Sequence, residues 1–298
     1  MALTIATTID EILAGLAGGA RPIAGGTDLV VGSRQGKFPL PEDLIAIDRV
    51  TELAGIEEGS TEIRIGSGVT HAQLMAPGVV VDQLTGIADA AALVGSPATR
   101  NVGTIGGNVM NGSPAMDTGA PLLVLGAQAE LRTAADTRLV ALDDLWVGPG
   151  KTSASPEELC TALVVPKPVA SSGSAYVRLE YRRSMEIAIV GAAAAVTLDG
   201  DVISSISVAL AAVAPTILPV VGLDQFVGQS PTEVTLGAIA EAASDQCTPI
   251  SDLRASERYR RKMIGVMAQR AVDAAAKRAA GVAIAVPVNR TIGIGAQS

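Results

Sequence analysis

The stretch NVGTIGGNVMNGSPAMD, residues 101–117, holds four glycines, three asparagines and one proline within seventeen positions. Glycine weakens helices and strands because it loses more backbone entropy on folding than any other residue. A cluster of glycines therefore indicates tight turns, or a main chain that closely approaches another group. A shorter glycine stretch, RPIAGGTDLVV, occupies residues 21–31.

Both glycine stretches lead toward predicted helices. In the shorter one, residues 22–24 are expected to end a strand, Gly25 and Gly26 to form a turn, and Thr27 or Asp28 to cap a helix. The longer one is expected to be a loop followed by a helix over residues 117–125. Because helix N-termini and free backbone N–H groups bind anionic oxygens, the two loops together predict a diphosphate site, and hence a dinucleotide. Neither stretch has the G-x-G-x-x-G spacing of a standard Rossmann site.

Charge and cysteine content exclude several functions. The formal net charge of −8 and the pI near 4.8 argue against a nucleic-acid surface or a general attraction to anionic lipid. Cys160 and Cys247 are the only cysteines, too few for an iron–sulfur cluster or a cysteine-rich zinc site. A reduced cysteine pair and an N-terminus without a basic secretory segment predict a cytoplasmic protein.

The uncharged segment 202–223 is long enough to be tested as a membrane span. It contains three serines and two prolines and follows the turn-like sequence LDGD, residues 198–201. We therefore expect a β-hairpin around Asp199 and Gly200, formed by residues 188–198 and 202–213, and no membrane insertion. A final helix is predicted from Ser256 to about Ala280, with Tyr259, Met263, Val266 and Met267 on its apolar stripe.

Five segments resemble a known family in the order in which they occur along the chain. PIAGGTDL (22–29) resembles a first flavin loop, and TIGGN (104–108) with SPAMD (113–117) resembles a second one. YRRSMEIAIVG (181–191) is similar to the basic segment and following strand, and RASERYRRKM (254–263) to the start of the C-terminal helix. The family is the FAD-binding subunits of molybdenum hydroxylases, and the resemblance covers nearly the whole chain.

The resemblance implies an α+β fold: a vanillyl-alcohol-oxidase or PCMH-type FAD-binding domain of two αβ subdomains, then a C-terminal α+β domain like that of the CO dehydrogenase flavoprotein. The FAD-binding domain is expected over residues 1–166, with subdomains of about 1–50 and 51–166. The Pro-, Ser- and Gly-rich segment 164–174 is the predicted boundary. The C-terminal domain is expected over 167–298, with an irregular tail after about residue 282.

The resemblance also implies which residues bind FAD. The two loops should line the pyrophosphate and the flavin, with Ile105 near the isoalloxazine ring and Asp117 hydrogen-bonded to the cofactor. Arg178 stands where relatives often have Lys, and Glu186 where Asp is commoner. The expected cofactor-binding residues are Ile23, Ala24, Gly25, Gly26, Thr27, Asp28, Leu29, Thr104, Ile105, Gly106, Gly107, Asn108, Asp117, Arg178 and Glu186.

Such a subunit is one part of a larger oxidoreductase. The resemblance implies an iron–sulfur small subunit with [2Fe–2S] clusters and a large subunit with the molybdenum cofactor, assembled as a dimer of heterotrimers. Electrons would reach FAD and then an external acceptor. Two alternatives stay open: a self-sufficient FAD oxidoreductase with its own substrate pocket, and a non-catalytic scaffold whose glycine loops are only turns.

The single histidine, His71, leaves few candidates for a general base near neutral pH. An electron relay needs none, because the flavin carries the redox chemistry. His71 follows Thr70 at a predicted helix start, so we expect a structural or surface residue. A covalent histidyl-flavin link, known in distant members of the fold, is the alternative.

Overall fold

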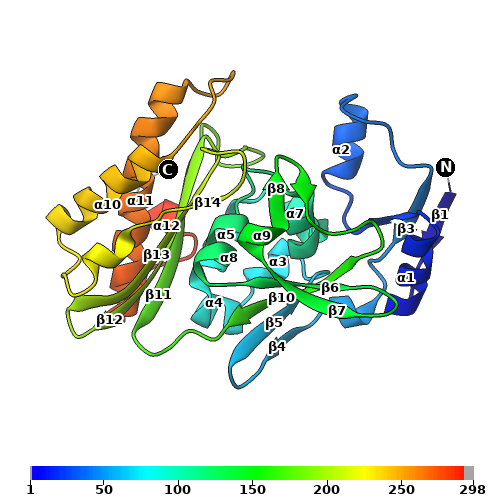
Figure 1. Ribbon diagram of the computed structural model, residues 1–298, viewed down its shortest axis with the longest axis horizontal. Coiled ribbons are helices and arrows are strands. Elements are labelled where there is room, and N and C mark those ends of the chain that lie inside the picture. The colour runs from blue at the N-terminus through cyan, green and yellow to red at the C-terminus, as the bar shows by residue number, and fades with distance from the viewer. Residues whose placement is uncertain (1, 292–298) are drawn as a thin grey trace.

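The computed structural model describes residues 2–291, which form three parts that follow one another from right to left in Figure 1. The N-terminal part is a parallel sheet in the order β1 (Ala2–Ile5), β3 (Asp43–Ala46) and β2 (Arg21–Ile23). Helix α1 (Ile9–Ala17) begins after Thr8, whose hydroxyl accepts the N–H of Glu11. Ile12, Leu13 and Leu16 recur at helical spacing and pack in a core with Ile45 of β3.

The first glycine stretch leaves this sheet at the end of β2. Residues 24–28 connect β2 to helix α2 (Leu29–Arg34), and Gly26 has a φ of +64°, a conformation that favours glycine. Asp28 is the N-cap residue, but its side chain makes no capping hydrogen bond. The predicted order of strand, glycine turn and helix is confirmed.

The middle part is a five-stranded antiparallel sheet in the order β4-β5-β10-β6-β7, with short helices packed against it. Alternate residues Ile63, Ile65, Leu163 and Val165 are fully buried beneath these helices. The strands are β4 (Ile56–Glu58), β5 (Glu62–Gly66), β6 (Gln128–Arg132), β7 (Thr137–Ala141) and β10 (Leu159–Pro166), with β8 (Trp146–Gly148) and β9 (Lys151–Thr152) as a separate pair. The helices are α3 (His71–Leu74), α4 (Val79–Gln83), α5 (Thr85–Leu93), α6 (Pro97–Val102), α7 (Ile105–Asn111), α8 (Gly119–Val124) and α9 (Leu142–Leu145), with a 3-10 turn at Thr51–Leu53.

The C-terminal part is an antiparallel sheet whose two faces are both covered. It contains β11 (Ser172–Leu179), β12 (Val190–Asp199), β13 (Val202–Ala211) and β14 (Leu218–Pro219), in that order. Helices α10 (Glu233–Gln246) and α11 (Glu257–Ala279) cover the outer face in Figure 1, while α5 and α8 lie on the inner side. A 3-10 turn at Leu223–Phe226 and helix α12 (Val288–Thr291) complete the described part.

Strand β12 shows why the core continues from the middle part into the C-terminal sheet. Ala192 and Ala194 pack with α11, whereas Ala193 points to the opposite face and joins the core of the middle part. These residues are small, so helices approach the sheet closely on both sides. The hairpin predicted around Asp199 and Gly200 is confirmed, and so is the interpretation of 202–223 as strand and loop. Among residues 2–291, no helix has the length and apolar composition needed to span a membrane.

The apolar stripe predicted for the last helix is correct at Met267, with Met263 and Val266 partly buried against the core, and wrong at Tyr259. Helix α11 begins and ends near the predicted residues, but Tyr259 is exposed, and the buried face consists of Ile264, Met267, Ala268 and Ala271. Toward its C-terminal end α11 contacts β11 closely, since a Cβ atom on Gly173 would lie 2.3 Å from the Ala275 carbonyl oxygen. Alanines suit this contact better than larger side chains do.

The predicted irregular tail after about residue 282 also needs correction. Residues 288–291 form helix α12, and Asn289 is buried against the main chain of Arg178, donating to its carbonyl and accepting its N–H. The rest of the predicted tail, residues 292–298, lies outside the described residues.

Candidate functional site

The first glycine loop presents unused backbone donors. The N–H groups of Gly25, Gly26, Thr27 and Asp28 donate to no acceptor within residues 2–291. These four residues are exposed or half-buried, so a ligand can reach them. Successive free N–H groups in a turn form a concave site for anionic oxygens.

The two glycine stretches touch each other at Gly25. A Cβ atom there would lie 1.9 Å from the carbonyl oxygen of Val102 and 2.9 Å from the nitrogen of Gly103. Glycine is therefore required for the main chains to approach this closely. The contact joins the end of β2 to the end of α6, segments about 75 residues apart in the sequence.

The second glycine stretch is largely helical, not the loop that its composition predicts. Thr104 caps α7 by accepting the N–H of Gly107 at 3.1 Å, and Ile105 and Val109 are buried in the core. The amides of Ile105 and Gly106 donate to Val69 and Ser67, so few donors remain free on this side. Burial of Ile105 and Val109 overrides the low helix propensity of the glycines.

Gly106 and Gly107 serve different purposes in α7. A Cβ atom on Gly106 would lie 2.4 Å from Cβ of Ser67, so this glycine is required for packing. Gly107 is exposed, and a Cβ atom added to it would meet only the Thr104 hydroxyl, at 3.1 Å. Gly107 therefore leaves bare backbone on the surface beside the contact between the two stretches.

Asp117 and Arg178, which the sequence placed separately, form a buried ion pair. Arg178 Nη1 lies 2.7 Å from Asp117 Oδ2, and the Tyr176 hydroxyl donates to Asp117 Oδ1 at 2.7 Å. Glu180 accepts from Nε of the same guanidinium at 2.9 Å. Burial raises the pKa of Asp117, and the Arg178 charge opposes that shift. Any cofactor atom bound to Asp117 would share carboxylate oxygens that already accept hydrogen bonds.

Two partners of Arg178 could have been found from the sequence. Tyr176, Arg178 and Glu180 alternate along β11 and its continuation, so their side chains share one face. Asn289 could not have been found this way, because it lies 111 residues away in the sequence.

Glu186 lies in an exposed loop, and its carboxylate pairs with Arg182 at 2.9 Å. Only its main-chain oxygen accepts from Arg178, at 3.3 Å. The loop is attached to the segment before α6, since Met185 N and Ser184 Oγ both donate to the Gly95 carbonyl. Glu186 is thus brought near α6 and Arg178, but its carboxylate does not contact the guanidinium.

Arginines surround this region. Burial lowers the pKa of Arg100, and the nearby charges of Arg290 and Arg178 lower it further. Arg100 donates to the carbonyls of Val94 and Gly95 and has no carboxylate partner within residues 2–291. Arg178 and Arg182, by contrast, pair with nearby carboxylates, so Arg100 is a cation of this region without such a partner among the described residues.

His71 is buried, with only 2% of its surface exposed, and thus not at the surface. Burial, with a smaller contribution from the charge of Arg100, lowers the pKa of its imidazole to about 4. The residue is therefore neutral in the folded chain at pH 7. Helix α3, which His71 begins, is fixed by a capping box between Thr70 and Gln73.

We expect this buried imidazole to make the folded chain acid-sensitive. An unfolded chain binds the proton near pH 6.5 and the folded one only near pH 4, so stability present at pH 7 is lost as the pH falls through this window. The loss attributable to His71 amounts to about 3 kcal/mol at most. Urea unfolding of wild type and His71→Gln from pH 7 to pH 4 measures it. Parallel curves for the two proteins would contradict the prediction.

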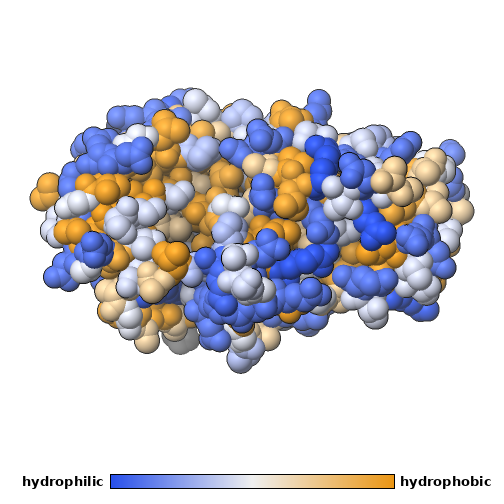
Figure 2. All heavy atoms as spheres, turned by 60° about the horizontal axis from the view of Figure 1, so that its bottom comes forward, coloured by the Kyte–Doolittle hydropathy of each residue, from blue (hydrophilic) through white to orange (hydrophobic). Residues whose placement is uncertain are grey.

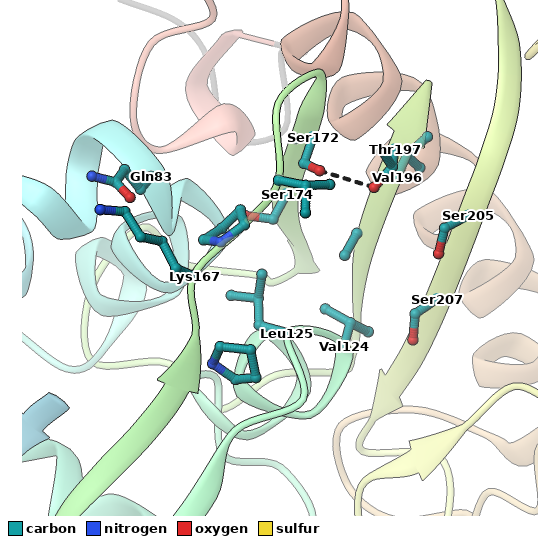
Figure 3. Close-up of a pocket in the computed structure, with 15 residues that line it drawn as sticks. Gln83, Val124, Leu125, Lys167, Ser172, Ser174, Val196, Thr197, Ser205 and Ser207 are labelled. Atoms are coloured by element: carbon teal, nitrogen blue, oxygen red, sulfur yellow. Dashed lines mark hydrogen bonds between the residues drawn. The ribbon is translucent and has the colours of Figure 1, made fainter. Parts of the chain in front are cut away.

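A separate cavity of about 190 Å³ lies between the middle part and the C-terminal sheet. Figure 3 shows the hydroxyls of Ser172, Thr197, Ser205 and Ser207 around it, with Lys167 and Gln83 on the opposite side. Figure 2 brings this face forward and shows hydrophobic residues around a hollow beside the hydrophilic middle of the molecule. The cavity is small for a dinucleotide, and neither glycine stretch lines it.

Comparison with known proteins assigns the fold and the cofactor. The family described as the FAD binding domain in molybdopterin dehydrogenase matches residues 1–168, and the CO dehydrogenase flavoprotein C-terminal domain matches residues 175–275. The carbon monoxide dehydrogenase medium chain of Afipia carboxidovorans is 34% identical over 261 residues, covering 87% of this chain and 90% of the relative. The putative xanthine dehydrogenase FAD-binding subunit of Escherichia coli K12 is 32% identical over 267 residues, covering 88% and 90%.

A solved structure agrees with these relatives. Carbon monoxide dehydrogenase from Hydrogenophaga pseudoflava superposes with a TM-score of 0.88 at 32% identity, covering 93% of this chain and 97% of the matched chain. These matches define an oxidoreductase flavoprotein whose cofactor is FAD. The chain belongs to the family of FAD-binding subunits of molybdenum hydroxylases. The expected α+β fold, an FAD-binding domain followed by the C-terminal flavoprotein domain, is confirmed.

Proposed function

We propose that this chain is the electron-transfer subunit of a heterotrimeric molybdenum hydroxylase. It would accept electrons from [2Fe–2S] clusters of a small subunit and pass them to an external acceptor, while a large subunit holds the molybdenum cofactor. Its length supports this assignment: the chain matches nearly the full length of separate medium chains, including one from a solved Cu,Mo-CO dehydrogenase. Relatives also include a subunit of a 6-hydroxypseudooxynicotine dehydrogenase complex.

The chemistry of the first glycine loop fits FAD. The pyrophosphate of FAD presents anionic oxygens, and the four unused N–H groups of residues 25–28 are donors of matching type. We assign FAD to the surface formed by residues 23–29 and 104–108, with Asp117, Arg178 and Glu186 nearby. The bare backbone of Gly107 would allow close approach of the cofactor.

When bound, FAD supplies the redox chemistry, accepting and releasing electrons. The task of the chain is then to bind and orient it. Loop amides would hold the pyrophosphate, and the buried Asp117–Arg178 pair would fix the inner wall of the site. No general base is required for this role.

Gly107→Asp is expected to weaken FAD binding at least tenfold, or about 1.4 kcal/mol. The new carboxylate would repel the pyrophosphate and occupy the surface that the cofactor approaches. Gly107 is exposed and meets only one side-chain atom, so the variant should fold normally. Gly107→Ala is the matched control and should retain most affinity. Flavin fluorescence titration measures both, and wild-type affinity in the Asp variant would refute this placement.

The subunit role is tested on material purified from the native cells. An absorption spectrum, subunit masses and metal analysis are taken from the same sample. Flavin together with iron and molybdenum on two partner chains is the expected result. Flavin on a lone chain without metals would instead favour a self-sufficient FAD oxidoreductase, and a colourless chain that takes up no flavin would favour a scaffold.

A further inference from the structure

His71 lies where the two glycine stretches meet. Its backbone N–H donates to the Gly103 carbonyl at 3.0 Å. A Cβ atom on Gly103 would lie 3.4 Å from His71 Cδ2 and 3.5 Å from the Thr27 hydroxyl. The imidazole ring and the first glycine loop therefore border the same short segment of main chain.

Neither ring nitrogen of His71 has a hydrogen-bond partner within residues 2–291. The side chain is only 2% exposed, and its fully enclosed nitrogen, Nδ1, lies where no ligand can reach it. The other nitrogen, Nε2, is not fully enclosed, so a ligand can supply the partner that the described protein atoms do not. The buried side-chain nitrogens and oxygens without a partner within residues 2–291 belong to Ser67, His71, Arg260 and Arg278, and of these four residues His71 is the one beside Gly103.

The two ring nitrogens differ in their surroundings, and this difference determines which of them carries the proton. Nδ1 is fully enclosed, whereas Nε2 is not. A neutral imidazole carries one N–H, and an enclosed N–H without an acceptor is rarer in proteins than an enclosed lone pair. The proton is therefore assigned to Nε2, which makes the accessible nitrogen a hydrogen-bond donor.

We propose that His71 is a cofactor-binding residue whose Nε2–H donates a hydrogen bond to an anionic oxygen of the FAD pyrophosphate. The inference rests on the placement of FAD given above and adds a side chain that the family resemblance did not include. His71 Cδ2, which is bonded to Nε2, and the Thr27 hydroxyl of the loop with free N–H groups both lie beside Gly103. The positive charge of Arg100 acts on the same ring, so an anion is the complementary ligand.

Two substitutions separate the hydrogen bond from the packing of the ring. His71→Leu fills the space but removes the donor, and we expect the dissociation constant for FAD to rise at least tenfold. His71→Gln places an amide N–H at similar reach and should stay within about threefold of wild type. Wild-type affinity in the Leu variant would overturn the proposal, as would equal losses in Leu and Gln.

Gly107→Asp, measured in the same titration, distinguishes failure of this inference from failure of the site. If Gly107→Asp loses affinity and His71→Leu does not, FAD lies at the glycine stretches but His71 does not bind it. If neither variant loses affinity, the assigned location of FAD is wrong.

The chain has one histidine, so a spectroscopic test needs no assignment. In the protein labelled with ¹⁵N-histidine, the nitrogen shifts report which ring nitrogen carries the proton. We expect the Nε2–H form without FAD, and a larger shift of Nε2 than of Nδ1 once bound flavin is detected by absorbance. A proton on Nδ1, or an unchanged Nε2 signal with flavin bound, would contradict the assignment.

Discussion

Gly25→Ala is expected to abolish measurable FAD binding, lowering affinity more than about 100-fold, or about 2.7 kcal/mol. The added Cβ atom would lie 1.9 Å from the Val102 carbonyl oxygen and 2.4 Å from its carbon. Both atoms belong to the main chain, so no side-chain rotation can relieve the clash. The two glycine stretches must separate, and the row of free N–H groups would lose its position relative to α7.

The same variant should remain folded, because the clash lies at the surface end of β2 and not in a core. Overpacking of this kind costs about 1–3 kcal/mol of stability. Gly237→Ala is the control: Gly237 lies within α10 with no atom within 4 Å of its added Cβ, and the change should stabilise the helix slightly. Flavin titration and urea unfolding of both variants give the comparison. A Gly25→Ala chain with normal FAD affinity would show that the contact between the stretches is not needed.

Asp89→Ala is expected to destabilise the chain by about 3–5 kcal/mol. Asp89 is fully buried and pairs with Arg278 through both carboxylate oxygens, and it also accepts the N–H groups of Tyr176 and Val288. Its removal leaves the largely buried Arg278 without a counter-charge and leaves two main-chain donors without an acceptor. This single carboxylate joins α5 to β11, α11 and α12.

The control for Asp89→Ala is an ion pair on α11, the helix that carries Arg278. Asp273 and Lys277 of α11 form an exposed pair at 2.7 Å, and Asp273→Ala should change stability by less than about 1 kcal/mol. Unfolding free energies from urea titration at pH 7 compare the two variants. Similar small losses in both would mean that the Asp89–Arg278 pair does not hold the two parts together.

Several features of the site follow from local sequence. The strand, turn and helix of residues 21–34 were predicted correctly because Gly25 and Gly26 interrupt an apolar pattern and α2 follows directly. The hairpin was predicted correctly because two strand-like segments flank the turn residues Asp199 and Gly200. Local patterns also place Tyr176, Arg178 and Glu180 on one face of a strand.

Other features have no local signal. Composition predicted a loop for residues 101–117, whereas burial of Ile105 and Val109 makes part of it helical. The stripe predicted for α11 included Tyr259, which is exposed, and omitted Ile264 and the alanines that pack in the C-terminal core. Sequence position likewise gave His71 a structural or surface location, and only the packing of α3 against Gly103 shows that its ring is enclosed.

The sequence by itself determined the family, the FAD cofactor, the α+β class and the residue types of both glycine stretches. These properties are set by spacing and chemistry within short segments. Only the tertiary structure decided that Gly25 touches Val102, that Asp117 pairs with Arg178, and that the His71 ring has no hydrogen-bond partner within residues 2–291. Each of these three features depends on residues that lie from about 30 to about 75 positions apart in the sequence. Such residues meet only when the sheets and helices pack, because burial and charge pairing are properties of contacts between segments.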